Sequence, residues 1–396
     1  MEIGFNTFWM AGFECTDQLN ASGDRVDLLG MTGHLELVRE DYSRICSLDI
    51  RTVREGIRWS VVEYKPYHYN FDFVLEMMQA AKEYQVQQIW DICHFGYPAD
   101  LSPFHPHFTR RFVSLCEAFV TFYIKHNPGE LLYVTPINEV SFISWLGGEV
   151  GATVPYCTKN GWELKYALMR AYIEGAKAMK RISGSVRIVT TEPLVNMVPG
   201  LEPTEEELAV AVLENEQQFQ AVDILCGRMC PELGGSEELV DVLGFNYYYN
   251  NQWIIGGYDF LGWNDPVADP RWRPLADLLE AAYRRYDKPV ILAETSHPKE
   301  DRPLWIQMIA SECAQLIERD VPLLGVCIYP VIDRPDWDHP DVWHHSGMWD
   351  TDFSGRYGRV LHQPSAIALL EGQKLIDRQL AYRKATRQDL HKVRLF

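Results

Sequence analysis

Residues 131–140, "LLYVTPINEV", decide how the fold of this chain is interpreted. The stretch begins as a short apolar run and ends on the polar pair Asn138 and Glu139. Short runs that are apolar on both faces are typical of parallel strands buried between two layers. A carboxylate is costly to bury unless it is paired or used, so Glu139 raises the question of what the ends of the other apolar runs carry.

Seven further apolar runs are separated by longer segments with helical spacing, and they lie near residues 3–9, 50–54, 87–93, 186–190, 240–246, 289–293 and 323–329. Strands that alternate with helices in this number predict an α/β protein, a (β/α)8 TIM barrel. We expect extended loops at its C-terminal face, after the fourth, sixth and eighth runs. No GxGxxG sequence follows the first run, which argues against a dinucleotide-binding sheet.

The domain organisation follows from the absence of a linker. The sequence contains no stretch rich in Gly, Ser and Pro between the predicted elements. We therefore expect a single barrel domain over residues 1–396, with a core at about 3–383 and a polar, loosely ordered tail after about Lys384.

Composition excludes several classes of protein. Hydrophobic residues make up 47% of the chain and the formal net charge is −18, so we expect a globular protein and no nucleic-acid partner. We find no signal-peptide pattern and no apolar run of the roughly 20 residues that cross a bilayer, so no membrane association is expected. The nine cysteines lie mostly in apolar segments, which favours reduced core residues and a cytoplasmic location. The oligomeric state is not predicted.

Polar residues follow most of the apolar runs. Besides Asn138 and Glu139, they are Glu14, Arg54, His94, Asn246, Tyr247, Tyr248, Glu294 and Tyr329. Each one alone is more often a cap, an ion-pair partner or a packing residue. Their repetition at the strand ends is informative because the loops at the C-terminal ends of barrel strands build the active site.

Two glutamates at opposite strand ends meet the needs of glycoside hydrolysis. Glu139 follows the fourth run and Glu294 ends the seventh, so only the fold can bring them together. One carboxyl group would protonate the leaving oxygen, and the other would attack the sugar at a separation of about 5–5.5 Å, or activate water at about 6.5–9.5 Å. Arg54 and Tyr248 suit the surroundings of an ionised nucleophile. No metal or organic cofactor is required.

Tryptophans and acids in the predicted loops suit sugar binding. Six tryptophans follow the fourth, sixth and eighth runs, namely Trp145, Trp253, Trp263, Trp337, Trp343 and Trp349, and half or more of them are expected only to pack the loops. The acidic residues Asp333, Asp336, Asp338 and Asp341 lack the spacing of a calcium loop, so we predict sugar contacts or solvated side chains and no metal.

Taken together, the motifs resemble those of the family 1 glycoside hydrolases, the β-glucosidase and β-galactosidase type of the retaining (β/α)8 clan. "HFGYPADL" at 94–101 is similar to the family's His-Trp-Asp-x-Pro, and "TPINEV" at 135–140 to its Thr-Phe-Asn-Glu-Pro. "VREGIRW" at 53–59, "GFNYYYN" at 244–250, "VILAETS" at 290–296 and "YPVIDRPDW" at 329–337 match further motifs in the same order.

The resemblance implies a role for each matching residue. Glu139 takes the place of the acid/base and Glu294 that of the nucleophile. Asn138 takes the place of the residue that binds the sugar 2-hydroxyl, and Tyr248 that of the tyrosine which orients the nucleophile. His94, Asp336 and Trp337 fall on sugar-binding positions, and Arg54 on the family's arginine.

The chain also departs from the family pattern. The family's proline after the acid/base is Val140, and its Asn-Gly after the nucleophile is Thr295-Ser296. The Trp-Ser of the eighth strand is Tyr329-Pro330, and Glu14 is the nearest candidate for the missing glutamine of the first strand. The pair of glutamates is intact, so the departures affect the identity of the sugar.

We therefore predict a retaining β-glycosidase that acts on a β-glucoside-like or β-galactoside-like carbohydrate. The basic and hydroxyl cluster typical of enzymes for 6-phosphosugars is missing, which disfavours a phosphorylated substrate. Two alternatives stay open at this point: another member of the clan, such as an endo-glycanase or transglycosylase, and a carbohydrate-binding or sensing protein without turnover.

Overall fold

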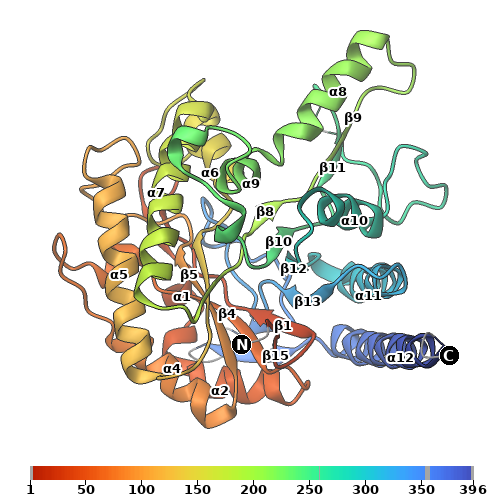
Figure 1. Cartoon of the computed structure of the whole chain (residues 1–396), viewed down its shortest axis with the longest axis horizontal. Helices are drawn as coiled ribbons and strands as arrows, with labels where there is room; N and C mark the ends of the chain where they lie inside the picture. Colours follow the sequence, from red (N-terminus) through yellow and green to blue (C-terminus); the bar gives the residue numbers. More distant parts are fainter. Residues whose placement is uncertain (1–2, 258, 353–356, 394–396) are drawn as a thin grey trace.

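The computed structural model describes residues 3–257, 259–352 and 357–393, and its centre is a closed barrel of parallel strands (Figure 1). Sheet order is β7-β6-β5-β4-β1-β13-β12-β10-β8. Its two ends, β7 and β8, are consecutive pieces of one segment, and Val189 between them bridges to Val242 next to β10. The sheet therefore closes on itself, as predicted. The strands are β1 (Trp9–Gly12), β4 (Thr52–Gly56), β5 (Gln87–Cys93), β6 (Leu132–Ile137), β7 (Val186–Ile188), β8 (Glu192–Pro193), β10 (Leu243–Asn246), β12 (Val290–Thr295) and β13 (Leu323–Ile328).

Amphipathic helices surround the strands (Figure 1). They are α2 (His34–Cys46), α4 (Asp72–Tyr84), α5 (Phe108–His126), α7 (Gly161–Ile182), α9 (Gln220–Leu225), α10 (Leu275–Tyr286), α11 (Arg302–Glu318) and α12 (Gln363–Val393). Helix α5 illustrates why they form. Phe112, Leu115, Phe119 and Tyr123 recur at a spacing of three or four residues and are buried on one face. That face packs against the sheet, and α5 also lies along α7.

Shorter elements complete the chain. They are α1 (Leu28–Met31), α3 (Trp59–Val62), α6 (Val140–Ser144), the π-helix Trp145–Val150, the 3-10 turns Pro231–Leu233, Glu237–Leu239 and Lys299–Asp301, and the strand pairs β2 (Asp17–Leu19) with β3 (Arg25–Asp27) and β14 (Trp349–Asp352) with β15 (Gly358–Leu361). None of the helices in the described ranges is long and apolar enough to cross a membrane.

One prediction of local structure is wrong. The first apolar run, 3–9, is not a strand, because β1 begins only at Trp9. Residues Ile3 and Phe5 instead pack against the barrel interior at the N-terminal end of the strands, which satisfies their apolar character in another way. At the other end of the chain, α12 extends to Val393.

The barrel interior is a separate apolar core inside the sheet. It contains Met10, Ile89, Tyr133, Val189, Val242, Ile291, Ala293, Cys327 and Tyr329. Packing near the C-terminal ends of the strands depends on Gly12, since a Cβ atom at this position would lie 2.0 Å from a ring carbon of Tyr329. A glycine at the end of β1 therefore leaves the room that the tyrosine ring occupies.

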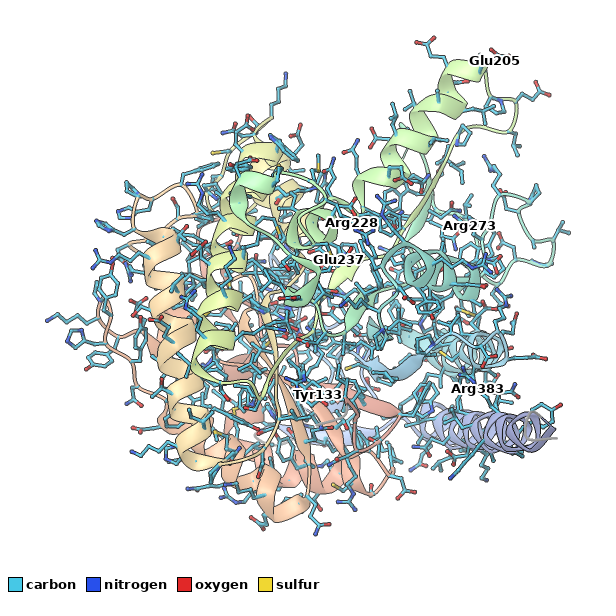
Figure 2. The ribbon with its side chains drawn as sticks, viewed as in Figure 1. Tyr133, Glu205, Arg228, Glu237, Arg273 and Arg383 are labelled. Atoms are coloured by element: carbon cyan, nitrogen blue, oxygen red, sulfur yellow. The ribbon has the colours of Figure 1, made fainter. Side chains whose placement is uncertain are left out.

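One long excursion leaves the barrel on the side of its C-terminal face. After β8 the chain forms β9 (Asn196–Val198) and α8 (Glu205–Gln217), and β11 (Gln252–Ile254) later pairs with β9 in parallel. We call these three elements the arm. Figure 2 labels Glu205 at the outer end of α8, far from the strands, whereas Tyr133 lies within the barrel.

The contact of Tyr133 with Gly4 allows a test of how the N-terminal segment covers the N-terminal end of the barrel. Its hydroxyl donates to the carbonyl oxygen of Gly4 at 2.9 Å and accepts the amide of Gly4 at 3.0 Å. We expect Tyr133→Phe to lower the free energy of unfolding by about 1–2 kcal/mol in chemical denaturation, because two hydrogen bonds are lost at a partly buried place. The exposed Tyr64→Phe is the control and should change nothing. An unchanged stability of Tyr133→Phe would show that these hydrogen bonds do not hold the N-terminal segment against the barrel.

Candidate active site

Glu294 lies at the C-terminal end of β12 and is held by two hydrogen bonds. Its Oε1 accepts from Nη1 of Arg54 at 2.8 Å, and its Oε2 accepts from the hydroxyl of Tyr248 at 2.7 Å. Arg54 comes from β4 and Tyr248 follows β10, so three strand ends meet here. A guanidinium and a phenol directed at the two oxygens fix the orientation of the carboxyl group.

Arg54 connects this carboxylate to a second one. The guanidinium is fully buried, and its Nη2 donates to Oδ2 of Asp91 at 2.6 Å and to Oδ1 of Asn138 at 3.2 Å. Burial would raise the pKa of Asp91, but the charge of Arg54 and the hydrogen bonds of Asp91 outweigh it and hold that pKa below its usual value. Two carboxylates therefore compensate the burial of one guanidinium.

Glu139 has a different environment. Its backbone is left-handed, with φ of 42°, and its Oε1 accepts from the amide of Asn246 at 2.9 Å. Burial and then the charge of Glu294 raise the pKa of the Glu139 carboxyl well above its usual value. Asn246 is the partner of Glu294 in the strand ladder, so the register of β10 and β12 brings the two glutamates to one place. A protonated acid beside an ionised carboxylate is the arrangement of an acid and a nucleophile.

His94 lies next to the glutamates and contacts Asp91, Tyr329 and Glu14. Its Nδ1 bonds Oδ2 of Asp91 at 2.9 Å, and its ring stacks on Tyr329 with centroids 5.7 Å apart. Its Nε2 lies 3.5 Å from Oε1 of Glu14, and Oε2 of Glu14 is 3.3 Å from Arg334. Burial lowers the pKa of His94, but Asp91 and Glu14 outweigh burial and raise it.

A cavity of about 1070 Å³ opens above these residues. Six of the predicted site residues line it, namely Glu14, His94, Glu139, Tyr248, Glu294 and Trp337. Its outer part is lined by aromatic side chains, among them Phe142, Trp145, Trp162, Trp253 and Phe260. Concave sites with an apolar lining and a few convergent polar groups are typical of small-molecule binding.

Four predicted site residues do not line the cavity. Arg54, Asn138 and Tyr329 are buried beneath its floor, where they contact the lining residues. Asp336 is turned to its own loop, because its Oδ1 accepts the amides of Asp338 and His339 and its Oδ2 lies 3.2 Å from Nε2 of His344. The expectation that many loop tryptophans only pack also fits: Trp349 is buried, and Trp263 packs on Trp305.

The sequence interpretation missed three residues of the site. Asp91 lies within β5, three residues before His94, and a charge inside an apolar strand was the signal for it. Asn246 was noted at its strand end without a role. Glu192 ends the fifth strand segment, the one strand end whose polar residue was passed over. All three are buried.

Two groups of side chains in the described ranges bring three potential metal ligands within 4.8 Å of one another. In Cys15, Asp91 and His94, the aspartate is already paired with Arg54. In Asp333, His345 and Asp350, Arg302 donates to both oxygens of Asp350 at 2.8 and 3.2 Å. A guanidinium already supplies the positive charge in each group, so we assign no metal.

Comparisons with known proteins place the fold. No protein-family model and no curated protein matches the sequence. Among solved structures, the family 1 β-glucosidase from Thermotoga maritima is similar, with a TM-score of 0.72 and 15% identity over 94% of this chain and 98% of that chain. The same TM-score and identity relate the chain to a β-glucosidase from Thermotoga maritima in complex with deoxynojirimycin, over 94% of this chain and 99% of that chain.

The β-glycosidase from the hyperthermophile Thermosphaera aggregans is also similar, with a TM-score of 0.69 and 16% identity over 87% of this chain and 86% of that chain. At such identities the likeness is one of fold. It confirms the predicted (β/α)8 barrel and, at the level of the fold, the resemblance to the family 1 enzymes.

The environment of Glu139 allows a test by stability. Because its folded-state pKa lies above the unfolded value, its contribution to stability is largest below the unfolded pKa and is lost as pH rises through the folded pKa. Glu139→Gln, which keeps an acceptor for Asn246, should therefore raise the midpoint of thermal unfolding at pH 7.5, by roughly 1 °C for each kcal/mol gained in a chain of 396 residues. The gain should shrink at pH 4. The exposed Glu206→Gln should show no such pH-dependent gain, and a midpoint for Glu139→Gln below that of the wild type at pH 7.5 would refute the prediction.

Proposed function

We propose that the chain is a retaining β-glycosidase and a divergent member of the family 1 glycoside hydrolases. One observation carries the proposal. Glu139 and Glu294 line the same cavity, and their surroundings differ, since Glu294 accepts from Arg54 and Tyr248 while Glu139 accepts from the neutral side-chain amide of Asn246. Two carboxyl groups in such unlike environments suit the nucleophile and the acid/base of double displacement.

In the first step, an oxygen of Glu294 attacks the anomeric carbon of the bound glycoside. The bond from that carbon to the leaving oxygen breaks, and the carboxyl group of Glu139 gives its proton to that oxygen. A covalent glycosyl ester of Glu294 results, and the alcohol leaves. The raised pKa of Glu139 favours the protonated form that this transfer requires.

In the second step, Glu139 acts as a base. The ester on Glu294 carries no charge, so one cause of the raised pKa of Glu139 is removed once the intermediate forms. Glu139 then takes a proton from a water molecule, whose oxygen attacks the anomeric carbon. The ester bond breaks, Glu294 returns as a carboxylate, and the sugar is released with its original configuration.

The proposed substrate is a neutral β-glycoside without phosphate. Three basic side chains other than His94 line the cavity, and each has a partner: Arg334 pairs with Glu14, Lys165 donates to Gln220, and His344 faces Asp336. Phosphate binding needs free cations or amides directed at the oxygens, and the described lining offers acids instead. Glu14, His94 and Trp337, which line the cavity, are proposed to contact the sugar, and the aromatic outer part to contact the leaving group.

The roles of the two glutamates can be separated by azide. We expect Glu294→Ala to lower kcat for an aryl β-glucoside by about 10³-fold or more, because the covalent step is lost. Added azide should restore turnover and give the α-glycosyl azide, whereas with Glu139→Ala it should give the β-glycosyl azide. Product configuration is read by NMR, and the surface variant Glu117→Ala should keep wild-type activity.

Either of two results would exclude the hydrolase. One is equal activity of wild type and Glu294→Ala. The other is an absence of hydrolysis across a broad panel of glycosides together with a rise in melting temperature on adding sugars, which would favour a binding or sensing protein.

The raised pKa of Glu139 predicts the shape of the pH profile. The profile of kcat/KM should be bell-shaped, with its alkaline limb well above pH 4.5, because activity is lost when Glu139 gives up its proton. In Glu139→Gln, measured on a 2,4-dinitrophenyl glycoside whose leaving group needs no proton, the alkaline limb should disappear. Persistence of that limb in the variant would assign it to another group.

A further inference from the structure

The first turn of α6 lacks its ordinary cap. Glu139 is the N-cap residue of this helix, and the side chain at that position usually accepts the amides of the first turn. Here it makes no such bond, because the carboxyl group points to Asn246 at the cavity. The side chain of Glu139 therefore contributes to the site and does not cap the helix. The first amides of α6 need another acceptor.

Glu192 supplies that acceptor from a neighbouring strand. Its Oε1 accepts the amide of Val140 at 2.8 Å, and its Oε2 accepts the amide of Ser141 at 3.0 Å. The amide of Glu139 itself donates to the carbonyl oxygen of Thr191 at 2.8 Å. Three successive amides, from Glu139 to Ser141, are therefore fixed by two successive residues at the end of the fifth strand segment.

The placement of Glu192 couples it to the other side of the same acid. β8 pairs with β10, where Glu192 lies opposite Phe245 and the next pair places Pro193 opposite Asn246. Asn246 holds the carboxyl group of Glu139, while Glu192 holds the backbone that follows it. One strand pair thus fixes both ends of the residue proposed as acid/base.

Burial of Glu192 is costly for a cap alone. The residue is 3% exposed, and Lys165, whose charge acts on it, donates its hydrogen bond to Gln220. Burial raises the pKa of Glu192, and the amides of Ser141 and Val140 oppose that rise. A neutral serine or threonine at a helix start would cap without burying a carboxyl group.

We propose that Glu192 is a positioning residue that sets the reach of the Glu139 carboxyl group through the amides of Val140 and Ser141. The inference rests on the function proposed above. It also accounts for Val140 at a position where the family has proline, since proline has no N–H to give to Glu192. Misplacement of the acid should slow proton transfer to the leaving oxygen and leave attack by Glu294 intact.

The test compares aryl β-glycosides with leaving groups of different basicity. A 2,4-dinitrophenolate departs without a proton, whereas 4-methylphenolate needs one. For Glu192→Ala, kcat/KM should fall by roughly 10- to 100-fold on the 4-methylphenyl substrate and by less than about 3-fold on the dinitrophenyl substrate. The quantity kcat/KM reports only steps up to formation of the glycosyl-enzyme, so the role of Glu139 as base does not enter.

A matched pair at position 140 serves if Glu192→Ala does not fold. Val140→Pro removes the N–H at a helix position that commonly accepts proline, and Val140→Ala keeps the N–H while removing most of the side chain. Only the proline variant should lose activity selectively on the 4-methylphenyl substrate. Glu63→Gln is the control for changing a buried glutamate that accepts a backbone amide, here that of Tyr67, and it should keep wild-type selectivity.

The outcomes are distinct. Equal losses on both substrates, or no loss, in an active Glu192→Ala or Val140→Pro protein would overturn the positioning role while leaving the glycosidase in place. Failure of the wild type to hydrolyse either substrate would overturn the proposed function itself. Selective loss in Val140→Ala as large as in Val140→Pro would assign the effect to side-chain packing and reject the role of the N–H.

Discussion

The site depends on one buried cation. Arg54 is fully enclosed at the end of β4, and an unpaired guanidinium in such a place would be prohibitively costly. It is tolerated because Asp91 and Glu294 both pair with it, from β5, which is the neighbour of β4, and from β12, which lies three strands away in the sheet. The charge of Arg54 thus requires acidic residues at two positions on other strands. The orientation of His94 in turn follows from its hydrogen bond to Asp91.

This pairing leaves Glu139 as the acid that the cation does not directly touch. Glu294 receives the guanidinium and the phenol, whereas Glu139 receives the amide of Asn246. The asymmetry is built from neighbouring positions, since Asn246 and Glu294 are partners in one ladder. Different surroundings allow two chemically similar groups to take different roles in one cavity.

Much of the fold was predictable from periodicity. The run at 87–93 coincides with β5, the run at 131–136 is offset from β6 by one residue at each end, and the run at 323–329 is one residue longer than β13. The 3–9 run misled because apolar residues that plug a barrel end have the composition of a strand. Polar strand ends also predicted the catalytic candidates, since the barrel gathers them at one face. The single-domain organisation and the separation of the two carboxyl groups stay predictions.

The rest of the site was not predictable because it depends on contacts between distant segments. Asp91 has meaning only once Arg54 is known to lie beside it, and Asp336 resembles a sugar ligand in sequence although it closes its own loop. Glu192 is the clearest case. Its partners are backbone amides, which every residue except proline has. The residue types at positions 140 and 141 therefore do not indicate the contact with Glu192.

Part of the cavity wall comes from the arm and not from the barrel. The floor belongs to the barrel, where a change at one strand end disturbs the charge balance of several others. Met197, Glu214 and Trp253 line the cavity from β9, α8 and β11, which pair with each other and not with the barrel sheet. Substitutions in the arm alter the shape of the cavity without touching the charged groups around Arg54. The shape of the upper cavity and the charge balance of its floor can therefore be changed independently of each other.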